Sequence, residues 1–217
     1  MGLYKTTILP RLTHWVCSQS DISKLRREVV PQAKGRVLEV GIGSGLNLPF
    51  YDPAKVKQVW GVDPSYELRA VAEKKADDLA FDLEFIGLSG EDIPLEKNAA
   101  DTVLVTYTLC SIPDVLRALK EMNRVLKPGG ELIFCEHGNA PDEHIRRWQK
   151  KINPIWTKIS GGCHLNRPIA DLIKESGFKI RHLDTSYSSS FKIVSFIYRG
   201  MAVHGKLFLT IIKEKHR

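Results

Sequence analysis

The fold is decided by one stretch of the chain, Val37-Leu38-Glu39-Val40-Gly41-Ile42-Gly43-Ser44-Gly45. An apolar run that ends in an acid is followed by a glycine-rich turn, as where a buried strand leads into a helix. Glycine is needed there because the backbone must approach a ligand closely and adopt positive φ. A dinucleotide-binding fold uses G-x-G-x-x-G, whereas this pattern is E-x-G-x-G-x-G, with Leu46 in the register after Gly45.

Three acidic residues follow three consecutive expected strands. Glu39 is placed to accept from the ammonium group of a ligand with an amino-acid end, directly or through water. Asp63, in Trp60-Gly61-Val62-Asp63-Pro64-Ser65, is placed like the acid that binds ribose hydroxyls, and Asp92 could accept from an adenine amino group. Alternatively, Glu39 caps a turn, Asp63 caps a helix and Asp92 is a solvated loop acid. Together with the glycine loop, however, the order of the three acids favours a ligand crevice at the carboxyl ends of the strands.

Short β-rich runs alternate with helical stretches from residue 36 onward. Strands are expected over 36–39, 58–62, 83–86, 102–106 and 131–135, and near 179–185 and 193–203; helices are expected over 3–30, 65–79, 114–126, 142–160 and 168–176. This order predicts an α/β fold, with a seven-stranded, mostly parallel sheet and helices on both faces. The last two strands follow one another without an obvious helix, which predicts a terminal antiparallel strand.

Length and composition exclude several protein classes. The 217 residues, 43% of them hydrophobic and 26% charged, indicate one folded domain. The longest clean apolar run, 207–212, is far short of the ~18–20 residues of a membrane span. The first residues lack the apolar core of a secretory signal, and the four scattered cysteines form no disulfide framework, so a cytoplasmic protein is expected.

The motifs resemble, in order, those of the class I S-adenosylmethionine-dependent methyltransferases. Glu39–Gly45, Asp63, 90–92, 101–111 and 124–134 carry the resemblance, which is strong over 34–137. It implies a Rossmann-like fold and S-adenosyl-L-methionine as cofactor. The glycine loop would pack on the methionine part, Asp63 would hold the ribose, and Asp92 with its neighbours the adenine. The cofactor-binding residues implied are Glu39, Gly41, Gly43, Gly45, Asn47, Asp63, Pro64, Ser65, Gly90, Glu91, Asp92, Thr106, Tyr107 and Leu109, of which 106–109 would flank the sulfonium.

A narrower resemblance concerns the acceptor. The stretches 108–112, Glu136-His137, 161–167 and 197–203 resemble the membrane-tethered alkyl thiol methyltransferases and their soluble bacterial relatives. This implies a thiol or hydrogen sulfide as the small-molecule acceptor. Methylation of a quinone ring carbon or of a phospholipid amine is the alternative within the enzyme class, and a non-catalytic cofactor-binding domain is a third. No N-P-P-[FY]-like clamp follows the fourth strand, so nucleic acid is not expected as a partner.

The reaction leaves little chemistry to the protein, because a sulfonium donor is already activated. The protein mainly has to align the acceptor and exclude water. A thiol reacts as its thiolate, and its free pKa is about 8.5. His137 is therefore the first candidate for a base or polar contact, His164 the second, and Tyr107 could shape the methyl site; a purely structural hydrogen-bonding role is the alternative for His137. Cys110 is expected to line the wall, since no covalent intermediate is needed.

No metal site is predicted. Cys17, Cys110, Cys135 and Cys163 include no C-x-x-C pair, and a zinc site built from Cys135, His137, Cys163 and His164 lacks ligand spacing.

The charge is distributed unevenly along the chain. A single domain over 1–217 is expected, with an N-terminal helical lid (1–33), a cofactor-binding core (34–137) and a substrate-covering insertion with closing strands (138–217). The formal charge is +5 over 1–36, −9 over 37–143 and +11 over 144–217. The excess positive charge therefore belongs to the segments expected to cover the acceptor. The amphipathic stretch 3–17 leaves peripheral membrane contact open, and nothing in the sequence indicates the oligomeric state.

Overall fold

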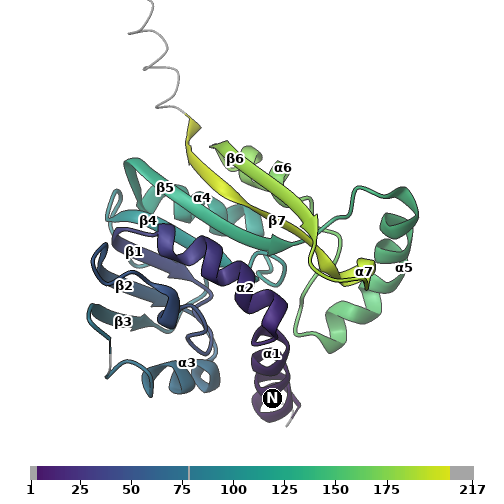
Figure 1. The fold of residues 1–217 in the computed structure, drawn as a ribbon, viewed down its shortest axis with the longest axis horizontal. Coiled ribbons are helices and arrows are strands. Elements are labelled where there is room, and N and C mark those ends of the chain that lie inside the picture. The colour runs from purple at the N-terminus through teal and green to yellow at the C-terminus, as the bar shows by residue number, and fades with distance from the viewer. Residues whose placement is uncertain (1–3, 78, 206–217) are drawn as a thin grey trace, which may run out of the picture.

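The fold is built on one mixed β-sheet (Figure 1). The computed structural model describes residues 4–77 and 79–205, and within them seven strands pair in the order β3-β2-β1-β4-β5-β7-β6. The strands are β1 (Gly35–Val40), β2 (Val56–Val62), β3 (Asp82–Ile86), β4 (Ala100–Thr106), β5 (Leu126–His137), β6 (Phe178–Tyr187) and β7 (Phe196–His204). The first five strands pair in parallel, whereas β7 pairs antiparallel with both β5 and β6. The α/β sheet with its terminal antiparallel strand is confirmed.

Helices cover both faces of the sheet. They are α1 (Leu9–Cys17), preceded by a π-helical turn (Tyr4–Ile8), α2 (Ser20–Val29), α3 (Tyr66–Glu73), α4 (Val115–Val125), α5 (Glu143–Ile159), α6 (Ile169–Glu175) and α7 (Lys192–Ser195). Val29 of α2 and Ala72 of α3 belong to one core cluster, whereas α4 and α6 belong to another on the opposite face, as Figure 1 shows. The apolar faces of α4 and α6 meet the sheet because their buried residues recur at helical spacing.

The helices expected over 3–30 are present as α1 and α2, with a break at Gln19 (φ −58°, ψ 149°) between them. Three other expectations are wrong in detail. The helix over 65–79 ends at Glu73, after which three-residue turns replace helical bonds. Leu126 already pairs with Ala100, so β5 begins before the Pro-Gly-Gly segment, which lies in a register irregularity. The short helix α7 separates the last two strands.

The strand order places a crevice between β1 and β4. From β1 the chain first adds β2 and β3 on one side, and it then continues with β4 on the other. Such a reversal leaves a crevice at the carboxyl ends of the strands. In Figure 1, α1 and α5 lie beyond these ends. The division into lid, core and covering segment stays a prediction, and residues 206–217 of the last segment, with its apolar run, lie outside the described residues.

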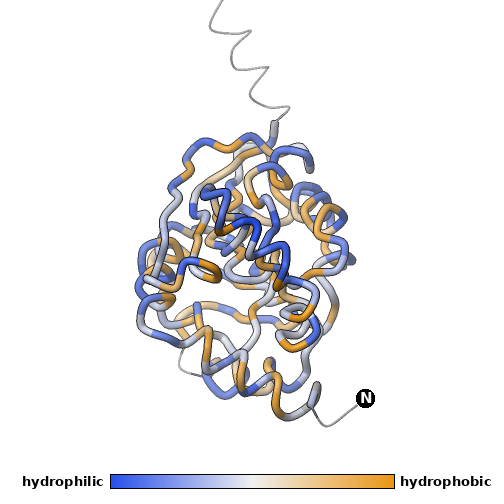
Figure 2. The backbone as a smooth tube through the Cα atoms, turned by 90° about the vertical axis from the view of Figure 1, so that its right-hand side faces the viewer, coloured by the Kyte–Doolittle hydropathy of each residue, from blue (hydrophilic) through white to orange (hydrophobic). Residues whose placement is uncertain are grey.

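Helix α5, at the start of the positively charged segment 144–217, lies at one side of the molecule in Figure 1. Helix α5 contains Arg146, Arg147, Lys150 and Lys151, and its side faces the viewer in Figure 2, where hydrophilic stretches cross it. Within 4–77 and 79–205, no helix combines the length and apolarity needed to cross a bilayer.

Candidate active site

The three glycines of the loop after β1 have different structural roles. All have positive φ, between 50° and 79°. A Cβ added at Gly41 would lie 2.0 Å from Thr108 Oγ1, and one at Gly45 would lie 2.7 Å from Leu48 Cδ1, so these two glycines permit close internal packing. At Gly43 a Cβ would meet nothing nearer than 3.9 Å. A Cβ at Gly43 would therefore make only ordinary van der Waals contacts, so this position favours glycine for its positive φ rather than for close internal packing.

Asp63 is held rigidly at the end of β2. Its Oδ2 accepts from Gly43 N at 2.9 Å, and its Oδ1 accepts from Ser65 N at 2.8 Å. Burial raises the pKa of Asp63, although these two N–H donors and Arg69 oppose the shift. Ser65 also caps α3 through its hydroxyl, so Pro64 and Ser65 set the turn that orients this carboxylate. Each carboxylate oxygen keeps a further lone pair for a ligand hydroxyl.

Glu39 lies at the centre of a buried hydrogen-bond network. Its Oε1 accepts from Asn47 Nδ2 at 2.8 Å and its Oε2 from Tyr51 Oη at 2.7 Å. Asn47 Oδ1 accepts in turn from Arg26 Nη1 at 2.6 Å, and the same Nη1 donates to Thr106 Oγ1 at 2.7 Å. Burial raises the pKa of Glu39. Glu39 is only 1% exposed, so its link to the crevice runs through Asn47 and Arg26.

Arg26 also lies in this region, although no sequence motif predicts it. It is 5% exposed although it lies on α2, and its guanidinium carbon lies 5.3 Å from the Tyr107 ring centroid. Its Nε is buried and has no partner among the described residues. A buried guanidinium nitrogen without an acceptor indicates a place for an anionic ligand group. The only sequence signal is its spacing of three from the buried Val29.

The three residues of the segment 90–92 differ in how the structure holds them. A Cβ at Gly90 would lie 2.7 Å from Val40 Cγ1, so glycine is required for this close approach to β1. Glu91 bonds to Ser89 and accepts from Asp114 N at 2.7 Å, which ties it to the start of α4. Asp92 is exposed, and its backbone N donates to Ser89 O. The predicted adenine contact of Asp92 is therefore not pre-arranged by bonds from its carboxylate.

The turn after β4 is held by a buried acid that the predicted site set omitted. Glu136 Oε1 accepts from Thr108 N at 2.7 Å and from Leu109 N at 3.1 Å, while Oε2 has no partner among the described residues. Glu136 is fully buried, and this burial raises its pKa to about 7 despite the two donors. The strained φ of 54° at Tyr107 belongs to the same turn.

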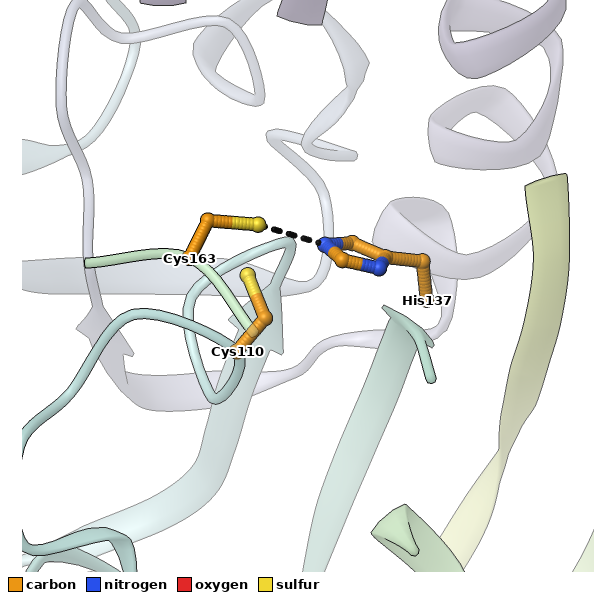
Figure 3. Close-up of side chains that lie close together, drawn as sticks. All are labelled: Cys110, His137 and Cys163. Carbon is orange, nitrogen blue, oxygen red and sulfur yellow. Dashed lines mark hydrogen bonds between the residues drawn. The ribbon is translucent and has the colours of Figure 1, made fainter. Parts of the chain in front are cut away.

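Sulfur and imidazole groups converge beside this turn (Figure 3). His137 Nε2 lies 3.1 Å from Cys163 Sγ, and the ligand atoms of Cys110, His137 and Cys163 all lie within 4.8 Å of one another. A hydrogen bond from the Cys110 thiol and then the neighbouring His137 lower the pKa of Cys163. Burial lowers the pKa of His137, but contact with Cys163 outweighs it, so the pKa is raised. The pKa of Cys110 is raised, first by its bond to Cys163.

The three predicted catalytic residues do not meet at one point. His137 faces the two cysteines, whereas the Tyr107 hydroxyl accepts from Cys135 Sγ at 3.9 Å in the core cluster of α2 and α3. The His164 ring pairs with the Asn153 amide at 3.2 Å. Cys135 and His164 are thus engaged elsewhere, and the group near His137 contains Cys110, which the zinc combination considered from sequence had left out.

Helix α1 bridges the two ends of the crevice. His14 Nδ1 lies 2.7 Å from Ser44 Oγ of the glycine loop, and the Tyr4 hydroxyl bonds to Ile159 O at the end of α5. A Cβ at Gly161 would lie 2.8 Å from Leu9, so the loop after α5 packs tightly on α1. Apolar side chains are exposed on α1 and at the end of the π-helical turn before it: Ile8, Leu12, Trp15 and Val16.

Comparison with known proteins agrees with this geometry. The methyltransferase domain family matches residues 38–134. Thiol S-methyltransferase TMT1B of Rattus norvegicus is 34% identical over 172 residues, which cover 74% of this chain and 70% of that protein. Thiol S-methyltransferase TMT1A of Homo sapiens is 31% identical over 174 residues, covering 76% and 70%. A solved S-adenosylmethionine-dependent methyltransferase of Thermotoga maritima shares the fold, with a TM-score of 0.61, 21% identity and coverage of 93% and 97%.

Proposed function

The chain belongs to the class I S-adenosylmethionine-dependent methyltransferases, and we propose that its methyl acceptor is a small thiol or hydrogen sulfide. S-adenosylmethionine is the cofactor of this class, and when bound it supplies an activated methyl group on a sulfonium. The chain itself has to bind this donor, hold the acceptor in line with the methyl group and keep water out.

The hydrogen-bonding groups of the crevice fit S-adenosylmethionine. The positive-φ backbone of Gly43 is tied to Asp63, and Asp63 would accept from the ribose hydroxyls. Arg26, with its partnerless buried Nε, would hold the donor's carboxylate. Glu39 would act on the ammonium end through Asn47. The excess of acidic residues over 37–143 suits a cationic donor.

The observation that carries the thiol assignment is the contact of His137 Nε2 with a sulfur atom at 3.1 Å. It lies beside the turn that would flank the sulfonium, so a sulfur atom is already accommodated as the partner of His137 at that end of the crevice. The buried guanidinium of Arg26 and the half-buried Arg167, which donates to Leu109 O, add positive charge around the turn. Positive charge favours the thiolate form of an incoming thiol. The two thiol S-methyltransferases among the relatives support the same acceptor class.

Purified protein incubated with methyl-labelled S-adenosylmethionine tests this function. The acceptors to compare are sulfide, small alkyl thiols, a demethylated quinol and phosphatidylethanolamine vesicles, with Asp63→Ala as a matched control for contaminating activity. We expect label in the methyl sulfide products only. Methylation of the quinol or lipid alone would overturn the thiol assignment, and tight donor binding without any turnover would favour the non-catalytic domain.

A further inference from the structure

We propose that Cys110, His137 and Cys163 bind one zinc ion, and that its fourth coordination position receives the acceptor thiol. The zinc site stands on the cluster alone, whereas the role of its fourth position rests on the proposed thiol methyltransferase function.

The three ligand atoms have metal-site spacing. They lie within 4.8 Å of one another, and His137 Nε2 and Cys163 Sγ are 3.1 Å apart. Zinc binds sulfur at about 2.3 Å and imidazole nitrogen at about 2.0 Å, so its ligands lie roughly 3.3–3.8 Å from each other in a tetrahedral site. Figure 3 shows Cys110, His137 and Cys163 pointing toward one another from three separate backbone segments.

The backbone around the cluster fixes this convergence. His164 N donates to Cys110 O at 2.8 Å, which pins the loop after α5 onto the turn after β4. Arg167 of the same loop bonds to Leu109 O. The loop itself depends on positive φ at Gly161 and Gly162. The backbone segments that contain Cys110 and Cys163 are thus held together by bonds other than contacts between the two cysteine side chains.

The surroundings of Cys163 suit a thiolate ligand. Trp156 Nε1, which can only donate, points at Cys163 Sγ at 3.5 Å, so the sulfur is an acceptor there. An N–H donor to a ligand sulfur is the usual outer support of a metal thiolate. The adjacent Glu136 is fully buried and has an oxygen without a partner, and a cation nearby offsets such a charge.

The ligand types select the ion. Two sulfurs and one imidazole exclude the oxygen-seeking Mg²⁺, Ca²⁺ and Mn²⁺ and favour thiophilic ions. Three protein ligands with an open fourth position are typical of catalytic rather than structural zinc. Cys110 follows Thr106 by four residues, so the cluster lies beside the turn that would flank the sulfonium.

The resulting step balances. A thiol that binds the zinc releases its proton to water and becomes a bound thiolate. The zinc with two protein thiolates is neutral, so the added thiolate gives the site a negative charge facing the cationic donor. The thiolate sulfur then forms a bond to the methyl carbon while the bond from carbon to the sulfonium breaks. The electron pair stays on the donor sulfur, and both products are neutral thioethers, which are weak zinc ligands and depart.

Metal analysis of the untagged full chain tests the site itself. After dialysis without chelator, we expect one zinc per chain, lost in Cys110→Ser, Cys163→Ser and His137→Ala. Cys135→Ser removes a buried thiol outside the cluster and should keep the zinc, which controls for general damage; circular dichroism checks that each variant folds. Wild-type protein that binds no zinc, or copper(I) in its place, overturns the assignment.

Cobalt(II) exchanged into the site tests the open position. We expect thiolate-to-cobalt charge-transfer absorption, and a change in the visible ligand-field bands when a small alkyl thiol is added. Cys17 is close enough for its charge to act on Cys163, so Cys17→Ser is the second control. It should leave both metal and spectrum intact; loss of metal would make Cys17 the fourth ligand and overturn the acceptor role.

The outcomes separate this inference from the proposed function. If zinc-free protein methylates a thiol and a chelator has no effect, the zinc inference is wrong and the proposed function stands. Stoichiometric zinc on the cluster, together with methylation of a quinol or lipid only, keeps the metal site and removes its role toward a thiol.

Discussion

The donor and acceptor ends of the crevice differ in how their buried acids are satisfied. At the donor end, both oxygens of Glu39 and both of Asp63 accept hydrogen bonds from nearby groups. At the acceptor end, Glu136 has one oxygen paired twice and the other not at all. Because an unpaired buried charge is costly, the difference indicates that the acids of the donor end are satisfied within the chain, whereas Glu136 at the acceptor end is left with an oxygen for a further partner.

The largest effect should come from breaking the acceptor end alone. His137→Ala removes the imidazole that lies 3.1 Å from Cys163 Sγ, so we expect the methylation rate with a thiol to fall by ~100-fold or more. Donor affinity by calorimetry should stay unchanged. His144→Ala, on the exposed start of α5, is the matched control. An undiminished rate in His137→Ala would contradict a role of His137 in methyl transfer at the acceptor end.

Breaking the donor end should act on binding. Asp63→Ala removes the carboxylate that would accept from the ribose, so we expect S-adenosylmethionine to bind on the order of 10–100-fold more weakly, because losing a hydrogen bond to a charged group costs ~1.5–3 kcal/mol. Asp82→Ala, an exposed acid at the start of β3, should bind normally. Unchanged affinity in Asp63→Ala would contradict the ribose assignment.

The same carboxylate predicts a pH dependence of donor binding. Burial raises the pKa of Asp63, and only its ionised form accepts from both hydroxyls. Affinity is therefore full above this raised pKa and is lost as pH falls through it, at a higher pH than for an ordinary aspartate. Asp63→Asn should remove this part of the dependence in calorimetry over pH 4–8. An identical slope in the variant would assign the pH effect to another group.

A smaller effect is expected at the junction between α2 and the crevice. Arg26→Lys keeps the charge but loses the planar fork that reaches both Asn47 and Thr106. Donor affinity should fall about tenfold by calorimetry. Arg27→Ala changes the neighbouring exposed arginine and should have no effect. Equal effects of the two substitutions would indicate a general change in surface charge.

The smallest effect should come from making the donor end resemble the acceptor end. Tyr51→Phe leaves Glu39 Oε2 without its donor, as Glu136 Oε2 is. We expect a loss of about 1–2 kcal/mol in the free energy of unfolding by urea titration, with donor affinity little changed. Tyr66→Phe, an exposed tyrosine, should be neutral. A Tyr51→Phe protein as stable as wild type would remove the premise of the comparison.

The same contrast explains what the sequence could predict. Glu39, Gly41 and Gly43 lie within five residues of one another, and Asp63 follows the next strand, so topology alone brings them together. Cys110 and His137 likewise lie at the ends of the neighbouring strands β4 and β5, but Cys163 reaches them through the path of the loop 160–168. Arg26 could not be predicted as a site residue, because a helical arginine is ordinarily solvated. Its burial depends on the packing of α2 over Tyr107. The rate measurement on His137→Ala tests the predicted role of His137, whereas the roles of Tyr107 and His164 stay predictions.

The N-terminal helical segment connects two distant parts of the molecule. His14 on α1 bonds to Ser44 of the glycine loop, and Tyr4, in the π-helical turn before α1, bonds to Ile159 O at the end of α5. Because one continuous segment makes both contacts, a displacement that breaks both bonds would release the glycine loop and the end of α5 together.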